Sequence, residues 1–331
     1  MGAASAPEPP APLRNSFISD GMRRRKGLAP AMQQTSSSSP SPTEPAGAKH
    51  VFSRNQVLIL GEGLPAAPRI LARLAELLDD PNTGTPEIAR VVETDPALAA
   101  RAIRLSNTIM FGPIGADVTD IQEALTRVGV TNVLGLVGAA GIAGWVAEPL
   151  PVYGIDLDTF QRSSLCHAQT AEHLAQQVGE DPRAAYIAGL LRGLGMIVLD
   201  RGGSVFKPQP AYDAVQYKSY DAFELEVFGL TSREATKILL DEWKFPKPIV
   251  DALDLHLLTT ADSVSNRLAC VVNVAGEIAA TAGHGLPGDD VHWTATPEKY
   301  EAIGVDADFW KDLCAAAKAR SAGIFAALGT A

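Results

Sequence analysis

The residue types that could bind a metal ion or transfer a proton are scattered through this chain of 331 residues. Histidine is the side chain most often found as a metal ligand, and two histidines share a helix face when they are three or four positions apart. His167 and His173 are six positions apart and do not meet this condition. A metal site built from His167, His256 and a carboxylate is therefore one hypothesis. Ordinary hydrogen-bonded or exposed histidines are the other.

Other patterns typical of catalysis are absent from the sequence. It has no GxxxxGK phosphate loop, no GxSxG nucleophile turn and no HExxH metal motif. The adjacent carboxylates Asp79-Asp80 and Asp289-Asp290 are interpreted as solvated loop residues rather than an acid–base pair. We therefore expect no catalytic residue of these classes.

One polar residue stands out inside an apolar stretch. Ala184 to Asp200 reads AAYIAGLLRGLGMIVLD, the pattern of a buried helix, and carries Arg192 and Gly193 in its middle. A guanidinium can bind a phosphate group through two parallel hydrogen bonds, so Arg192 could hold a nucleotide. A surface or salt-bridging arginine is the alternative.

The elements that must position these residues are predicted to be helices. From Val57 onward apolar residues follow the i, i+3, i+4, i+7 spacing of a helix face, and alternating β-branched strands are missing. Asp95-Pro96 and Asp120 are typical helix starts, and Gly129 a typical helix end. The downstream helices are predicted at Phe160–Val178, Asp181–Leu199, Thr231–Trp243, Pro248–Leu258, Ser263–Ala282, Pro297–Ile303 and Ala307–Leu328.

The most apolar stretch is Val133 to Ala147, VLGLVGAAGIAGWVA. It falls short of the roughly 20 residues that span a bilayer. Its glycines recur every third residue and would let a neighbouring element approach closely. We interpret it as a central buried helix and expect no membrane span.

Composition divides the chain. Residues 1–50 are rich in Pro and Ser without apolar periodicity, and they are predicted to be a disordered tail. Its basic run, Arg23 to Lys26, could contact a membrane surface, a nucleic acid or an acidic partner, or simply be solvated. The formal net charge of −10 argues against nucleic-acid binding by the chain as a whole. Three widely spaced cysteines suit a reducing compartment, so a cytoplasmic location is expected.

The order of motifs resembles the HDOD family, helical modules of bacterial signalling proteins related to the HD phosphohydrolases. The resemblance rests on LPAAPRILARLAELLDD from Leu64, PEIARVVETDPALAARAIRLSN from Pro86, the Phe111-Gly112 pair and IQEALTRVGVTNVLGLV from Ile121. It continues through FQRSSLCHAQTAEHLA, the Arg192 stretch, FGLTSREATKILLDEWKFPKPIVDALDLH and RLACVVNVAGEIA.

The resemblance implies an all-α, HD-domain-like helical bundle over residues 57–285. It would consist of two adjoining helical lobes, 57–148 and 155–285, followed by a C-terminal helical extension over residues 286–331. No cofactor is expected.

HD phosphohydrolases bind metals through a histidine, an adjacent His-Asp pair and a late aspartate. By alignment these positions correspond to Ser163, Arg192-Gly193 and the neighbourhood of Gly276. Serine is a poor ligand, glycine offers none, and an arginine brings a fixed cation. The resemblance therefore implies a degenerate HD motif whose metal site is lost. The candidate residues of this vestigial cleft are Ser163, Arg192, Gly193, Ser232, His256, Asn273 and Gly276.

The function implied is a non-catalytic regulatory module acting through protein–protein interaction. Its partners would be signalling proteins in trans, of the receiver, kinase or cyclic-di-GMP-turnover type. The first alternative is a sensor that binds a nucleotide in the vestigial cleft. A metal-dependent phosphohydrolase is the hypothesis that the sequence favours least.

Overall fold

The computed structural model describes residues 51–328, apart from Pro81 and residues 109–116, 130–131, 146–147 and 294–295. All the described residues belong to one compact unit of the chain. The tail predicted over residues 1–50, with its basic run, lies outside them, as does the Phe111-Gly112 pair.

The described chain is helical, as predicted. Its first group of helices comprises α1 (Arg54–Glu62), α2 (Ala67–Asp79), α3 (Thr85–Val92), α4 (Pro96–Ser106), α5 (Ile121–Val128) and α6 (Val133–Trp145). Asp95 and Asp120 cap α4 and α5 with their side chains, and Gly129 ends α5 with φ of 80°. These boundaries follow from local chemistry, because each capping carboxylate accepts backbone N–H groups that have no partner within the helix.

A longer series follows. It comprises α7 (Leu157–Val178), α8 (Pro182–Leu191), α9 (Leu194–Gly203), α10 (Tyr220–Val227), α11 (Ser232–Glu242), α12 (Lys247–Leu255), α13 (Arg267–Ala279), α14 (Pro297–Ile303) and α15 (Ala307–Leu328). Short turns lie at η2 (Ala261–Ser265), η3 (Ala280–His284) and η4 (Asp290–His292). The only β-type pairing in the described residues is a single bridge between Leu150 and Ile155.

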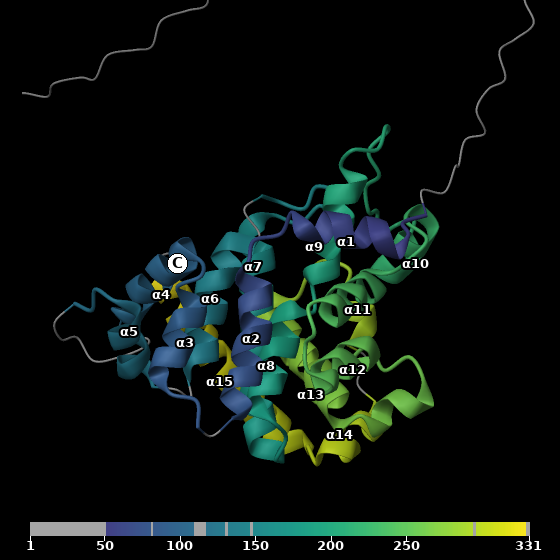
Figure 1. The fold of residues 1–331 in the computed structure, drawn as a ribbon. Coiled ribbons are helices and arrows are strands. Elements are labelled where there is room, and N and C mark those ends of the chain that lie inside the picture. Colours follow the sequence, from purple (N-terminus) through teal and green to yellow (C-terminus); the bar gives the residue numbers. More distant parts are fainter. Residues whose placement is uncertain are drawn as a thin grey trace, which may run out of the picture. The chain divides into compact units, whose positions relative to one another are not determined.

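Two packing layers meet at α7 and α8. These two helices pack on each other, and α13 packs on both. On one side α2 and α6 contact α8, with α4 and α5 beyond them; on the other lie α11 and α12 (Figure 1). Apolar side chains from all these helices form one continuous core, with Tyr186, Phe160 and Leu71 among its fully buried members.

The turn that links α6 to α7 is fastened by two buried carboxylates. Asp200 on α9 accepts the N–H of Val152 at 2.8 Å, and Glu224 on α10 accepts the hydroxyl of Tyr153 at 2.8 Å. Glu224 also accepts the N–H of Ser232 at 2.6 Å. Burial raises the pKa of Glu224 to about 7 and that of Asp200 to about 6, against the opposing effect of their hydrogen bonds.

The glycine-rich helix α6 is buried, as its sequence predicts. A β-carbon at Gly138 would lie 2.7 Å from the Tyr186 hydroxyl, so this glycine does admit a close neighbour. A β-carbon added at Gly135 would have no neighbour within 4 Å, so the close approach is not continuous along the helix. Among the described residues one stretch, Pro182–Gly203, is long and apolar enough to cross a membrane by composition alone, but 83% of its most apolar 18-residue window is buried inside the protein.

The prediction of one helix over Asp181–Leu199 is wrong. The chain forms α8 and α9 instead, and they are separated at Arg192 and Gly193. Tertiary contacts account for the break, since α9 runs against the start of α11. The N–H of Gly195 donates to Thr236 Oγ1 at 2.9 Å, and a β-carbon on Gly195 would lie 1.9 Å from the carbonyl oxygen of Ser232.

Candidate functional site

The break between α8 and α9 places Arg192 at the centre of a buried polar cluster. Its Nη2 donates to Asp289 Oδ2 at 2.7 Å and to Ser163 Oγ, on α7, at 3.4 Å. The Arg192 and Asp289 side chains are only 8% and 5% exposed. The expectation that Asp289 is a solvated loop residue is therefore wrong, whereas Asp290 beside it is exposed.

Trp293 completes the cluster. Its ring lies 5.3 Å from the Arg192 guanidinium and 5.7 Å from the ring of His167, which it meets edge to face. The indole takes the space beside Gly276, where a β-carbon would lie 2.8 Å from Trp293 and 2.9 Å from His167. We call Ser163, His167, Arg192, Gly276, Asp289 and Trp293 the Arg192 cluster.

A second set of buried contacts adjoins this cluster through α13. Asn273 donates to the carbonyl oxygens of His256 and His292 at 2.8 and 3.1 Å, and accepts from Lys299 Nζ at 3.0 Å. Lys299, 1% exposed, also pairs with Glu277 at 2.8 Å. These bonds fasten α14 and the chain before it onto α13.

Both buried histidines of the region are held neutral. Burial, reinforced by the Arg192 cation, lowers the pKa of His167 well below its ordinary value, and its Nε2 lies 2.7 Å from the carbonyl oxygen of Val272. Burial lowers the pKa of His256 to about 3, with Nδ1 at 2.7 Å from the carbonyl oxygen of Leu253. The ring nitrogens that make these bonds are engaged by backbone oxygens rather than facing one another.

The candidate residues selected from the sequence therefore lie in different parts of the fold. Ser163, Arg192 and Gly276 come together, and His256 and Asn273 lie directly beside them. Gly193 faces Phe160, whose ring would lie 2.7 Å from an added β-carbon. Ser232 packs against Gly195 and donates its N–H to Glu224, so it belongs to the contact between α9 and α11.

The residues of the Arg192 cluster do not fit a divalent metal. The positions aligned with the His-Asp pair hold a guanidinium already paired with a carboxylate, and an indole occupies the space beside Gly276. Across the described ranges no group of three or more His, Cys, Asp or Glu side chains could hold a metal ion. The hypothetical set of His167, His256 and a carboxylate does not assemble there.

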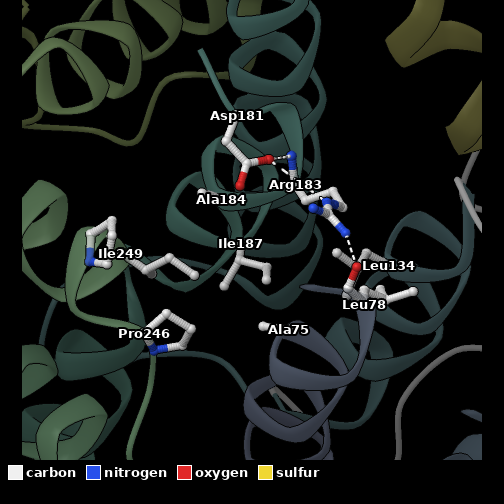
Figure 2. A pocket seen from close by; sticks show the side chains of 10 residues that line it. Ala75, Leu78, Leu134, Asp181, Arg183, Ala184, Ile187, Pro246 and Ile249 are labelled. Atoms are coloured by element: carbon white, nitrogen blue, oxygen red, sulfur yellow. Dashed lines mark hydrogen bonds and ion pairs between the residues drawn. The ribbon is translucent and has the colours of Figure 1, made fainter. Parts of the chain in front are cut away.

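Two pockets elsewhere in the described residues are small or shallow. One of about 70 Å³ lies between α2, α6, α8 and α12, walled by apolar side chains such as Leu78, Leu134 and Ile187 (Figure 2). Asp181 and Arg183 stand at its edge, and Arg183 donates to the carbonyl oxygen of Leu78. A hollow of about 420 Å³ on α5 is lined by Asp120, Gln122, Glu123 and Thr126. Neither resembles the enclosed pockets of roughly 300–1,000 Å³ that take nucleotide-sized ligands.

Comparison with known proteins now settles the family. Residues 64–257 match the HDOD domain. The chain belongs to the HDOD family. No curated protein sequence matches it.

Solved structures share this HDOD fold. An "HDOD domain protein with unknown function" from Geobacter sulfurreducens is 19% identical, with a TM-score of 0.62 over 83% of this chain and 97% of its own. A "Putative signal transduction protein" from Marinobacter aquaeolei VT8 is 21% identical, with a TM-score of 0.63 over 86% of this chain and 62% of its own. A "Putative phosphohydrolase" from Shewanella amazonensis SB2B is 23% identical, with a TM-score of 0.60 over 83% and 98%. At these identities the likeness shows the fold alone.

Sequence reasoning missed Asp289, Trp293 and Lys299. All three lie beyond residue 257, outside the matched range. The sequence did contain a signal for Trp293, because a large aromatic side chain in a glycine-rich polar loop usually indicates that the side chain is buried. Asp289 and Lys299 had none, because only the fold brings their partners near.

Proposed function

We propose that this HDOD protein is a non-catalytic bacterial regulatory module that acts by binding other signalling proteins. The observation that carries the proposal is the ion pair between Arg192 and Asp289, at the position where the family resemblance puts a His-Asp metal pair. A fixed cation there opposes metal binding electrostatically, and its carboxylate partner comes from within the chain.

The chemistry of the surrounding groups supports the same proposal. Metal-assisted hydrolysis needs neutral imidazoles and carboxylates facing one ion, with room for a water. Here His167 and His256 bind backbone oxygens, and Trp293 fills the neighbouring space. Such a module would act by presenting a surface to which other proteins bind. We propose that its partners are cytoplasmic proteins acting in trans: receiver, kinase or cyclic-di-GMP-turnover proteins.

Two measurements test this proposal. The purified full chain, mixed with Mg²⁺ or Mn²⁺ and a cyclic dinucleotide, is expected to give no turnover above the metal-only blank. Pairwise binding against receiver, kinase and cyclic-di-GMP-turnover proteins from the same bacterium is expected to find at least one saturable complex. Metal-dependent turnover that disappears in His167→Gln and His256→Gln would contradict the non-catalytic role. Binding to none of the three classes would contradict the partner role.

Nucleotide sensing is the second candidate, and the buried Arg192 guanidinium is the observation that favours it. A nucleotide phosphate would have to replace Asp289 and displace Trp293. Nucleotide binding that is unchanged in Arg192→Ala would exclude this candidate.

A further inference from the structure

Arg192 is incompletely satisfied. A guanidinium presents Nε–H and Nη2–H side by side, as one edge that matches the two oxygens of a carboxylate or phosphate. In the Arg192 cluster only Nη2 is engaged by the Asp289 carboxylate, while the buried Nε has no hydrogen-bond partner among the residues that the structure describes. Leaving a buried donor without a partner is energetically unfavourable.

The carboxylate that meets this edge belongs to a short segment, Leu286–Trp293. Only three of its side chains, Leu286, Asp289 and Trp293, are buried. Asp290 and Val291 between them are exposed. The segment therefore lies along the protein with Asp289 and Trp293 inserted into the Arg192 cluster.

Backbone hydrogen bonds also tie the segment to the rest of the protein. Its backbone oxygens at Pro287 and His292 accept from Tyr220 and Asn273. His292 Nε2 lies 3.9 Å from Asp221, beyond hydrogen-bond distance. Gly288, with φ of 89°, allows the turn that directs Asp289 inward.

We propose that the Nε–Nη2 edge of Arg192 is an oxyanion-binding site, that Asp289 is its internal ligand, and that an external carboxylate or phosphate group occupies it when the Leu286–Trp293 segment lifts. A ligand oxyanion that bonds both nitrogens satisfies the donor that Asp289 leaves unpaired. The Trp293 indole, released with the segment, gives up the space beside His167 and Gly276. The site thus couples ligand binding to exposure of this segment. It rests on the same Arg192 site as the nucleotide-sensing candidate and does not depend on the protein partners proposed above.

Removing the internal ligand tests the site directly. In Asp289→Ala, acetate or inorganic phosphate is expected to raise the melting temperature saturably, by at least about 3 °C over potassium chloride of equal ionic strength. The two anions distinguish a carboxylate from a phosphate site. Asp290→Ala, which removes the neighbouring exposed carboxylate, and the double variant Asp289→Ala, Arg192→Leu are expected to show no such rise. An equal response in the double variant, or none in Asp289→Ala, overturns the proposal.

The intact protein supplies a second measurement that needs no variant. Hydrogen exchange of the backbone amides from Asp289 to Trp293 is expected to accelerate at least about threefold in high phosphate or acetate relative to chloride, while amides within α13 keep their rates. Unchanged exchange in this segment with both anions overturns the proposal, whatever the stability of Asp289→Ala. Because neither measurement involves a partner or turnover, their failure is distinct from failure of the proposed function.

Discussion

Arg192 and Asp289, 97 positions apart in the chain, form a 2.7 Å ion pair that is almost wholly shielded from water. The pair joins the α8–α9 break to the segment after α13. Its energetics differ from those of a surface pair, because removing either partner leaves the other charge buried.

Truncation of this pair is the first prediction. Arg192→Ala should lower the free energy of unfolding by about 3–5 kcal/mol, measured by urea denaturation. Arg73→Ala is the matched control, since Arg73 pairs with Glu76 while 60% exposed, and it should cost less than about 1 kcal/mol. Equal losses in the two variants would show that the Arg192 charge is not buried in solution.

The contribution of Glu224 to stability should fall between acid and neutral pH. Burial raises the folded-state pKa of this carboxyl to about 7 from 4.5, so its contribution is fully present below pH 4.5 and is lost as the pH rises through 7. The loss is of the order of 3 kcal/mol. Glu224→Gln keeps an acceptor for the Ser232 N–H, and its stability relative to the wild type should rise between pH 5 and 8. A difference independent of pH would contradict the assignment.

His256 should produce the opposite slope at lower pH. Its folded-state pKa of about 3 lies below the ordinary value of 6.5, so stability is lost as the pH falls from 6.5 toward 3, because the unfolded chain takes up the proton. In NMR spectra of the native protein the His256 ring should show no titration between pH 5 and 8. A midpoint near 6.5 would mean that the ring is solvated.

The close packing of Trp293 against Gly276 can be tested by adding one methyl group. Gly276→Ala places a β-carbon 2.8 Å from the indole and 2.9 Å from His167, and should destabilise the protein by about 1–3 kcal/mol. Gly135→Ala is the matched control, because a β-carbon added at this helical position would have no neighbour within 4 Å. It should be neutral or stabilise the protein by up to about 1 kcal/mol. A neutral Gly276→Ala in thermal unfolding would indicate that Trp293 is not seated against α13.

The sequence predicted most helices well because their signals are local. Asp95 and Asp120 mark helix starts through hydrogen bonds to the next few residues. Apolar residues at helical spacing indicate which face of a helix is buried. The family followed from the order of such local blocks. The α8–α9 break did not, because it depends on how closely Ser232 and Thr236 approach Gly195 from another helix.

Part of the candidate site could also be predicted from the sequence. Ser163, Arg192 and Gly276 were selected by alignment, and the structure brings them together. Their environment was not predictable, since a carboxylate in a Gly-rich loop normally faces water. Only the fold shows that Asp289 is the exception and that Asp290, its neighbour, is not.

The position of Asp289, Trp293 and Lys299 beyond residue 257 bears on how the protein can be divided. A fragment trimmed to residues 64–257 would keep Arg192 and lose its counter-ion, together with α13, which packs on α7 and α8. We therefore expect the smallest fragment that folds on its own to be larger than the matched range, residues 64–257. Work on isolated fragments of this protein has to retain residues through α14 at least.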